Sequence, residues 1–341
     1  MIHSFESLDI QSKNTFGISA RCRRWIDFDT PQDLPVVFSS FPTGERWKMI
    51  GGGSNLLFTG DFDGVILHSC IKGVTISEEN MTERSVMVRV GSGEVLDEVI
   101  EYLCEHDVWG LENLSGIPGE AGAGAVQNVG AYGVEIKDCL YKVEVYDVER
   151  NEFMTLDVSE CGYAYRYSMF KAPENQSRYI ITYVTFKLSM LPMPKLGYGS
   201  LGSTFGHRQP SALEVRRAVI DTRREKLPEV GEFGSAGSYF KNPVVTEQLY
   251  EHIRSEMNSD IAIPHFAVDG GIKIPAAWLI DQCGWKGKVK GNAAVWHKQP
   301  LIIVNHTGNA TSDDILALER EIVESVERKF HVTLSPEVEK V

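Results

Sequence analysis

The chain has 341 residues, long enough for two or three domains with buried cores. Hydrophobic residues make up 43% and charged residues 24%, a composition typical of a globular protein that excludes a disordered or fibrous one. The formal net charge of −13 argues against a general nucleic-acid-binding protein, because such proteins neutralise phosphates with many lysines and arginines.

Short β-type segments dominate the first half of the chain. One amphipathic helix is predicted among them over residues 94–107, where apolar residues recur at helical spacing. This mixture lacks a regular βαβ series and therefore predicts an α+β fold. The runs that predict strands are WKMIGGG, GVILHSC, SVMVRVGSG, YKVEVYDV and RYIITYVTFKLSM.

The second half begins with a break in regular structure. Residues 191–203, LPMPKLGYGSLGS, are rich in proline and glycine and predict a domain boundary. Ser211 opens a capping-box pattern, so we expect a helix that starts there and ends before Pro228. Another helix with an apolar stripe is predicted over residues 312–330, and the closing HVTLSPEVEKV is typical of a strand that runs into a proline.

The cysteines and the apolar runs limit the cellular setting. The six cysteines form no CxxC pair, and no histidine stands at metal-ligand spacing from them, so we expect reduced thiols and no metal. No apolar run is long enough to span a bilayer, and the first residues lack the pattern of a secretory signal. These features predict a cytoplasmic protein that does not insert into membranes.

Two glycine-rich stretches call for a ligand close to the backbone. GGGSNLLF at residues 51–58 follows a predicted strand but matches neither GxxxxGK nor GxGxxG, so a phosphate-binding loop and a tight turn both remain open there. GLENLSGIPGEAGAGAVQNVGAYG at residues 110–133 combines small residues with Gln127, Asn128 and Tyr132. Its composition predicts backbone wrapped against a large flat ligand.

A series of motifs matches one enzyme family in order. The first half carries NTFGI, GGGSNLLF, GLENLSGIPG, QNVGAYGVE and CGYAYRYSMFK, and the second half carries RREKLP, GSAGSYFKNP, AAWLIDQCG, AAVWHKQPLIIVN and LSPEV. From about Asn14 to Val338 the chain resembles the UDP-N-acetylenolpyruvoylglucosamine reductase (MurB) family, in its longer, enterobacterial-like form.

The resemblance implies a fold and a cofactor. Residues 1–190 would form an FAD-binding domain of the vanillyl-alcohol-oxidase/PCMH type, with two α+β subdomains divided near residue 70. Residues 191–341 would form an α+β substrate-binding domain whose last strand returns toward the flavin. The positions that would hold FAD are Gly51, Gly52, Gly53, Ser54, Asn55, Leu56, Gly119, Ala123, Gly124, Gln127 and Asn128.

The implied reaction transfers a hydride from NADPH through FAD to an enolpyruvyl ether on UDP-N-acetylglucosamine, which gives UDP-N-acetylmuramate for peptidoglycan synthesis. Arg166 would face the substrate carboxylate, because its planar guanidinium can form two parallel hydrogen bonds with a carboxylate while negative charge develops there. Ser238 would donate the proton to C2, and Glu337 would assist protonation or orient the substrate. We expect a monomer that binds the UDP-sugar and NADPH.

Further substrate contacts follow from the same resemblance. Ala123 and Gly124 stand where some relatives have serines, and only Phe266 or His265 is available where the enterobacterial form has a tyrosine near residues 264–275. The positions that match substrate contacts are Tyr132, Tyr165, Tyr198, Arg223, Lys226, Asn242 and Gln299. Arg223 and Lys226 share a helix face and would supply a basic patch to an otherwise acidic chain.

Two alternative functions remain. An FAD-dependent oxidase of another alcohol or sugar would share the glycine-rich stretches, but it gives no reason for Ser238, Glu337 and the KNP segment to occur together. A non-catalytic UDP-sugar-binding relative would need none of Arg166, Ser238 and Glu337.

Overall fold

The computed structural model describes residues 1–80, 84–199, 201–229, 231–257 and 262–341. The chain divides into two compact units. The first comprises Met1–Leu8, Cys22–Gly53 and Phe62–Arg223, and the second comprises Asp9–Arg21, Ser54–Asp61 and Arg224–Val341. The contacts therefore place the last division after Arg223, whereas the proline and glycine content pointed to residues 191–203. Composition detects a break in regular structure, but the contacts of the following helix decide the unit to which it belongs.

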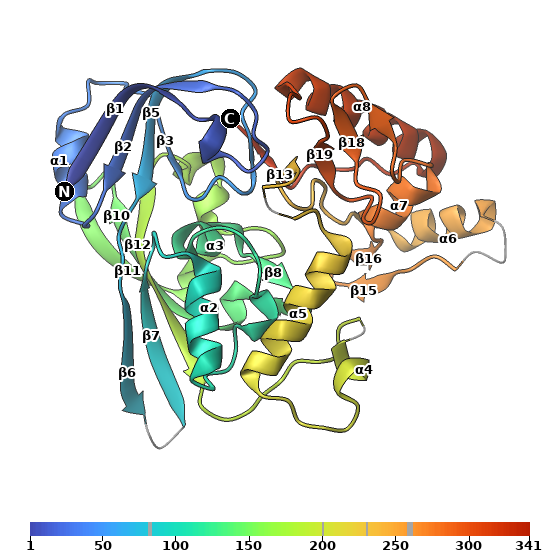
Figure 1. Ribbon diagram of the computed structural model, residues 1–341, viewed down its shortest axis with the longest axis horizontal. Helices are drawn as coiled ribbons and strands as arrows, with labels where there is room; N and C mark the ends of the chain where they lie inside the picture. The colour runs from blue at the N-terminus through green and yellow to red at the C-terminus, as the bar shows by residue number, and fades with distance from the viewer. Residues whose placement is uncertain (81–83, 200, 230, 258–261) are drawn as a thin grey trace. The chain divides into compact units, whose positions relative to one another are not determined.

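A small, partly parallel sheet opens the first unit (Figure 1). Its strand order is β1 (Ile2–Asp9), β2 (Arg21–Phe28), β5 (Phe62–Ser69) and β3 (Trp47–Ile50), and β5 runs parallel to both β2 and β3. Helix α1 (Asp33–Ser39) adds Leu34 and Val37 to the buried cluster on this sheet. The sheet places His68, near the end of β5, opposite Asp27 of β2.

A larger antiparallel sheet forms the rest of the first unit. Its order is β11 (Glu152–Asp157), β10 (Leu140–Asp147), β12 (Tyr179–Ser189), β7 (Ser85–Gly91) and β6 (Val74–Asn80). Helices α2 (Leu96–Glu105), α3 (Ala121–Gln127) and α5 (Ala212–Lys226) share one hydrophobic core with it, and α4 (Leu201–Phe205) contributes Leu201. The predicted helices at 94–107 and 211–227 are confirmed as α2 and α5.

Short elements connect these layers. β8 (Gly130–Ala131) and β9 (Val134–Glu135) form a hairpin whose two loop residues, Tyr132 and Gly133, both have positive φ, as a type I′ turn requires. Single 3₁₀ turns lie at Gln11–Lys13, Glu112–Leu114, Ile136–Asp138, Val158–Cys161, Met169–Lys171 and Pro173–Asn175.

Over its described residues, the second unit has two small sheets, one two-stranded pairing that involves the last strand, and three helices. One sheet has the order β13 (Gly234–Ser235), β19 (Ile303–Asn305), β18 (Ala293–Val295) and β17 (Val289–Lys290), and the other has β14 (Val244–Val245), β16 (Gly271–Lys273) and β15 (Phe266–Val268). The helices are α6 (Glu247–Glu256), α7 (Ala276–Gln282) and α8 (Ser312–Phe330). Both units mix helices with sheets, so the predicted α+β class is confirmed.

Helix α8 has the predicted bounds and buries the predicted stripe. Thr311 caps it with a capping box that includes Asp314, and the stripe from Ile315 to Phe330 is buried. The prediction of a strand that runs into Pro336 is wrong: residues 331–335 form no strand, and the last strand, β20 (Glu339–Lys340), lies after the proline, where it pairs in parallel with β4 (Leu56–Leu57).

All six cysteines are free thiols, as predicted. Over the described ranges, no helix is long and apolar enough to cross a membrane.

We expect Leu318→Ala to destabilise the second unit by about 2–5 kcal/mol, because Leu318 is fully buried in its core and the truncation leaves a cavity. Urea unfolding followed by circular dichroism measures the change. Glu324→Ala on the exposed face of α8 is the matched control and should change the free energy of unfolding by less than about 0.5 kcal/mol. Equal effects of the two substitutions would contradict the buried position of Leu318.

Candidate active site

The two glycine-rich stretches pack directly against each other within the first unit. A Cβ added to Gly51 would lie 2.8 Å from the Cβ of Ala123 and 3.1 Å from Oε2 of Glu120. A Cβ on Gly52 would lie 3.5 Å from the Cα of Gly119. Gly51 can therefore approach Ala123 and Glu120 this closely only because it lacks a side chain, whereas a Cβ on Gly52 would make an ordinary contact. Two segments that were predicted to hold one cofactor thus lie side by side.

Two positions of helix α3 that were predicted to contact the cofactor, residues 124 and 127, direct their side-chain positions toward other protein groups. A side chain at Gly124 would meet Leu96, Ile136 and Val129, so a serine there would point into the apolar core. The side-chain oxygen of Gln127 accepts a hydrogen bond from Nζ of Lys171 at 2.5 Å. Only the backbone of residue 124 is therefore suited to touch a bound cofactor.

Asn128 ends α3 in the left-handed conformation, at φ +47°. Its side chain is fully buried and forms hydrogen bonds with protein groups at both ends. The amide nitrogen donates to the carbonyl of Ala164 at 2.8 Å and to Oε2 of Glu135 at 3.1 Å, while Oδ1 accepts from the backbone N–H of Lys137. The side chain therefore shapes the site, and a cofactor contact at this position would come from the backbone.

Arg166 occupies the second central position of a tight turn. Ala164 and Tyr167 pair through two backbone hydrogen bonds of 3.0 Å, and Arg166 adopts φ +53°, which is strained for a residue with a side chain. Its Nη2 donates to the carbonyl of Gly130 at 2.8 Å, and its guanidinium lies 5.2 Å from the centre of the Tyr165 ring. The turn thus fixes the backbone of Arg166, and the hydrogen bond to Gly130 fixes its guanidinium.

Two residues that the sequence analysis missed support Arg166. Oε1 of Glu135 lies 3.9 Å from Nη1 of Arg166, and Nζ of Lys171 lies 3.3 Å from its carbonyl oxygen. Glu135 belongs to the motif QNVGAYGVE and Lys171 to CGYAYRYSMFK. The motifs contained both residues, but only the tertiary structure shows which residue each one contacts.

Tyr132, Tyr198 and Arg223 gather in another part of the first unit. The rings of Tyr132 and Tyr198 meet edge to face, with centroids 5.9 Å apart. Nε of Arg223 donates to the carbonyl of Gly116 at 3.1 Å, and burial lowers the pKa of its guanidinium. No carboxylate of the described chain forms an ion pair with Arg223, which leaves its terminal N–H groups suited to an anionic ligand.

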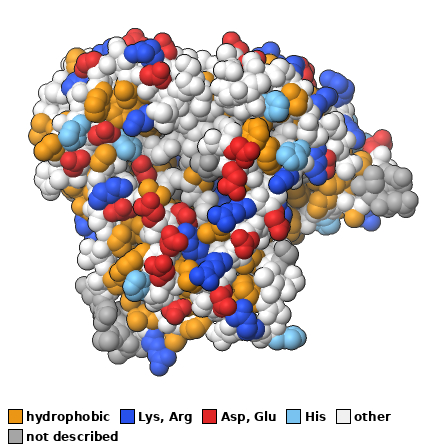
Figure 2. Space-filling view, in the orientation of Figure 1, with side chains coloured by type: hydrophobic (Ala, Val, Ile, Leu, Met, Phe, Trp, Pro, Cys, Tyr) orange, Lys and Arg blue, Asp and Glu red, His pale blue; other side chains and the backbone are white. Residues whose placement is uncertain are grey.

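The basic residues of α5 do not act alike. Arg216 is buried and pairs with Asp97 through both guanidinium nitrogens, one of them at 3.1 Å from the carboxylate. On the face seen in Figure 2, acidic and basic side chains alternate over α2 and α5 and form no broad basic field. Arg216 thus has a carboxylate partner, whereas no described carboxylate forms an ion pair with Arg223.

The second unit brings Ser238 and Glu337 together from distant parts of the sequence. The backbone N–H of Glu337 donates to the carbonyl of Tyr239 at 2.8 Å, and the N–H of Lys241 donates to the carbonyl of Ser335 at 2.9 Å. Ser238 follows Gly237, whose φ is +69°, and its side chain is exposed. Two predicted catalytic residues thus lie on paired segments.

Asn55 joins the same region of the second unit. Its side-chain nitrogen donates to the carbonyl of Glu337 at 3.2 Å, and its own carbonyl accepts from the N–H of Glu339 at 3.0 Å. The parallel pair of Leu56 with Glu339 continues this contact. The end of the GGGSNLLF motif is therefore tied to the LSPEV motif by the side chain of Asn55, and to Glu339, just after that motif, by a backbone hydrogen bond.

The remaining substrate positions of the second unit are more dispersed. Oδ1 of Asn242 accepts from the N–H of Ala276 at the start of α7, at 2.9 Å. Lys226 ends α5 and its carbonyl accepts from Nε1 of Trp296 at 3.0 Å. Gln299 lies in the turn between β18 and β19, where its carbonyl accepts from the N–H of Ile302.

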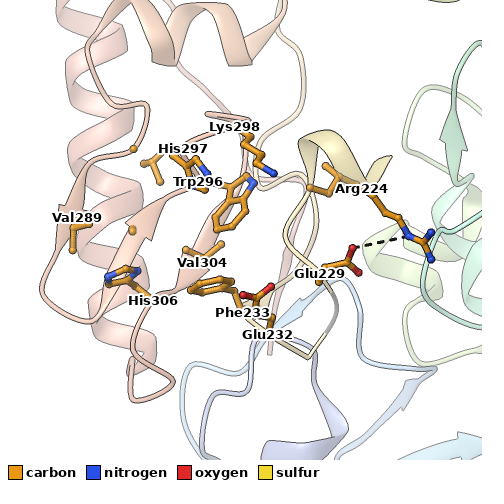
Figure 3. Close-up of a pocket in the computed structure, with 14 residues that line it drawn as sticks. Arg224, Glu229, Glu232, Phe233, Val289, Trp296, His297, Lys298, Val304 and His306 are labelled. Atoms are coloured by element: carbon orange, nitrogen blue, oxygen red, sulfur yellow. Dashed lines mark ion pairs between the residues drawn. The ribbon is translucent and has the colours of Figure 1, made fainter. Parts of the chain in front are cut away.

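A cavity of about 580 Å³ opens in the second unit (Figure 3). Its walls include Phe233, with its ring centroid 5.2 Å from that of Trp296 and 6.4 Å from that of His306, to which it is nearly parallel. Of the described residues that line this cavity, none belongs to the predicted site. The cavity is therefore no part of the predicted site, although Trp296 in its wall donates to the carbonyl of Lys226.

One cluster carries metal-ligand chemistry. Asp27, His68 and Cys70 each bring one potential ligand atom within 4.8 Å of the others. However, Nδ1 of His68 lies 2.8 Å from Oδ1 of Asp27, which is the distance of a hydrogen bond. We therefore describe the group as a hydrogen-bonded cluster and assign no metal to it.

Comparison with known proteins identifies the family. One family model, described as an FAD binding domain, matches residues 42–156, and another, described as UDP-N-acetylenolpyruvoylglucosamine reductase, C-terminal domain, matches residues 229–341. The UDP-N-acetylenolpyruvoylglucosamine reductase of Bacteroides fragilis strain YCH46 is 43% identical over 335 residues, which are 98% of each chain. The chain belongs to the UDP-N-acetylenolpyruvoylglucosamine reductase family.

Other members of the reductase family give the same result. The enzyme of that name from Porphyromonas gingivalis strain W83 is 40% identical over 97% of each chain. The crystal structure of UDP-N-acetylenolpyruvylglucosamine reductase (MurB) from Thermus caldophilus shares the fold, with a TM-score of 0.66 at 22% identity, and covers 100% of this chain and 98% of that one.

The reductase-family tyrosine expected near residues 264–275 has no direct substitute. His265 lies 2.9 Å from the hydroxyl of Tyr250 and is held against α6. Phe266 is 54% exposed on β15 and has no hydroxyl to offer a diphosphate.

Asn128 provides a test of the site's framework. We expect Asn128→Ala to lower the free energy of unfolding by about 2 kcal/mol or more, because buried partners of the amide are left without hydrogen bonds. Asn128→Gly should cost about 1 kcal/mol less than the alanine variant, since glycine tolerates the left-handed backbone. Asn175→Ala, which removes a single side-chain hydrogen bond, is the control in the same denaturant titration. Identical values for the alanine and glycine variants at 128 would contradict a strained backbone there.

Proposed function

We propose that this chain catalyses the NADPH-dependent reduction of UDP-N-acetyl-3-O-(1-carboxyvinyl)-glucosamine to UDP-N-acetylmuramate, as an FAD-dependent enzyme of peptidoglycan precursor biosynthesis. The observation that carries the proposal is the 43% identity to the Bacteroides fragilis reductase over 98% of both chains. The contact between the two glycine-rich stretches and the pairing of Ser238 and Glu337 segments support it independently.

The chain's backbone fits a large cofactor. Gly51 and Gly52 pack on the residues before and within α3, and Gly53 and Gly119 have positive φ that glycine adopts without strain. When bound, FAD would accept a hydride from NADPH and pass it to the enolpyruvyl group. The residues proposed to hold it are Gly51, Gly52, Gly53, Ser54, Asn55, Leu56, Gly119, Ala123, Gly124, Gln127 and Asn128, the last two of which act mainly through their backbones.

Arg166 is proposed to bind the substrate carboxylate. Its Nη2 donates to the carbonyl of Gly130, and Oε1 of Glu135 lies 3.9 Å from its Nη1, so the guanidinium is held in place before a substrate binds. Negative charge that develops next to the carboxylate would be stabilised by this preorganised donor. Tyr165, half-exposed beside the guanidinium, is proposed to contact the same substrate.

Ser238 and Glu337 are proposed to deliver the proton. Ser238 is exposed at a glycine turn, so its hydroxyl can approach a substrate atom. A hydroxyl is a weak acid, but a carbanion is a strong enough base to take its proton. The backbone pairing of Glu337 with Tyr239 holds the carboxylate on the segment beside the serine.

The other substrate residues offer an anion site and a packing surface. Arg223 keeps N–H groups available for a phosphate, and the edge-to-face pair of Tyr132 and Tyr198 presents aromatic surface to a sugar or a base. Lys226, Asn242 and Gln299 are proposed to complete the contacts to the UDP group.

Several finer assignments also remain proposals. We assign FAD binding to residues 1–190 and substrate binding to residues 191–341, and we place the chain in the longer, enterobacterial-like form of the family because of the segment around Tyr198. We further propose that the protein acts as a cytoplasmic monomer, without nucleic-acid partners and without membrane insertion.

A visible spectrum tests the proposed reaction. The purified protein, kept anaerobic, should show bound flavin that loses its absorbance with NADPH and regains it on addition of the UDP-enolpyruvyl sugar. Recovery with oxygen alone would support an oxidase instead. Absence of flavin, with none taken up from added FAD, would support a UDP-sugar-binding relative without this chemistry.

Ser238→Ala separates the two halves of the reaction. We expect the loss of flavin absorbance with NADPH to keep its rate within about threefold, whereas turnover of the enolpyruvyl sugar falls by about 10²–10⁴-fold, the usual contribution of a general acid. Stopped-flow absorbance measures both steps. Ser235→Ala, on the neighbouring strand β13, is the control and should leave both rates unchanged. Equal slowing of the two steps would contradict a proton-donor role for Ser238.

A further inference from the structure

A buried histidine bridges two carboxylates next to the glycine-rich loop. Nδ1 of His68 lies 2.8 Å from Oδ1 of Asp27, and its Nε2 lies 2.8 Å from Oε1 of Glu120. All three side chains are at most 20% exposed. None of the three was predicted as a site residue, although Glu120 lies within the second glycine-rich stretch.

The geometry favours a doubly protonated imidazole. An ionised carboxylate can only accept hydrogen bonds, and a neutral imidazole can donate from only one of its two nitrogens. Two carboxylates at hydrogen-bond distance therefore favour the imidazolium. Burial opposes this charge, but the hydrogen bonds to Asp27 and Glu120 outweigh it and raise the pKa of His68 to about 9.

Trp25, Cys70 and Lys72 lie around the histidine cluster. The ring of Trp25, on β2, lies 5.6 Å away, and its Nε1–H donates to Asp27 at 2.7 Å. The thiol of Cys70, just after β5, lies 3.7 Å from Nδ1, and burial raises its pKa, so it is neutral at physiological pH. Lys72 acts on that thiol electrostatically, and its Nζ lies 3.5 Å from Oε2 of Glu94. His68 is the cation at hydrogen-bond distance from both Asp27 and Glu120.

Glu120 links this cluster to the proposed cofactor site. Its Oε2 would lie 3.1 Å from a Cβ on Gly51, the first glycine of GGGSNLLF. A carboxylate in this position would repel a diphosphate held by the same loop unless a cation neutralised it. His68 is the cation in contact with it.

We propose that His68 is a positioning residue for the FAD diphosphate, which it favours by neutralising Glu120 beside Gly51. This inference rests on the proposed function, since it needs FAD to bind along the glycine loop. It assigns His68 no contact with the cofactor. The role is electrostatic and acts through Glu120, so removal of the carboxylate should make the histidine dispensable.

The test measures the affinity of the flavin-free protein for FAD by fluorescence titration at pH 7.5. We expect His68→Gln to weaken FAD binding about tenfold or more, because an opposite charge typically shifts a neighbouring group's equilibrium by at least one pKa unit. The double variant His68→Gln with Glu120→Gln should return to within about threefold of the unmodified protein. Glu120→Gln alone, which keeps the histidine, should bind FAD at least as tightly as the unmodified protein and covers the case in which His68→Gln fails to fold.

A pH series adds a readout that a purely structural role would not change. The charged histidine is the form that favours FAD, so affinity should hold at neutral pH and fall as the pH rises through about 9. This fall should be absent from the double variant. His106→Gln, at the end of α2 with an exposed side chain, is the matched control and should behave like the unmodified protein.

Four outcomes would overturn the inference while leaving the proposed function intact. Three of them are full affinity in a folded His68→Gln variant, a double variant as weak as His68→Gln, and a stoichiometric metal ion that is lost with His68. Loss of more than tenfold in Glu120→Gln would also overturn it, because Glu120 would then be a ligand in its own right. If the unmodified protein bound no FAD at any pH, the proposed function itself would fail.

Discussion

The close approach of Gly51 to the start of α3 is the constraint on which the packing of the two glycine-rich stretches depends. Gly51 packs on Glu120 and Ala123 at distances that leave no room for a side chain. Helix α3 meets the same demand from its other side, since a Cβ on Gly122 would lie 2.7 Å from the side chain of Ser92. Small residues here cost conformational entropy in the folded chain, and the core formed by the large sheet and its helices offsets that cost.

Backbone strain occurs at three of the predicted site residues. Asn128, Tyr132 and Arg166 are among the eight described non-glycine residues that adopt positive φ. Each is held by an identifiable structure: a buried amide with three hydrogen bonds, a type I′ hairpin and a two-residue turn. Such strain persists only where the surroundings determine the conformation, and it is common at functional sites. Here the positive-φ conformations fix the backbone positions of Tyr132 and Arg166 within short turns.

The second unit organises its proposed catalytic residues around the end of the chain. β20 pairs with β4, and the segment before it pairs with residues 239–241 through backbone hydrogen bonds. Backbone pairing fixes the position of Glu337 more firmly than a freely moving C-terminal tail would. In the first unit, the cluster of Asp27, His68 and Glu120 likewise holds a charged group in a fixed position. It places the carboxylate of Glu120, which is paired with His68, beside the glycine loop.

The sequence alone determined the elements that rest on local periodicity and on motif order. Helix α8 has its predicted bounds because a capping box and a 3.6-residue apolar stripe are local signals, and the ordered motifs sufficed to indicate the family.

Only the tertiary structure decided the remaining features. It assigned α5 to the first unit through the burial of Ala212, Val215 and Val219. It confined the last strand to the two residues that find a partner in β4, and it turned the Asn128 side chain inward. It also joined His68 to Glu120, which lie 52 positions apart. The physical reason is that hydrogen bonds and charge pairs between distant segments depend on which surfaces meet, and local sequence carries no record of that.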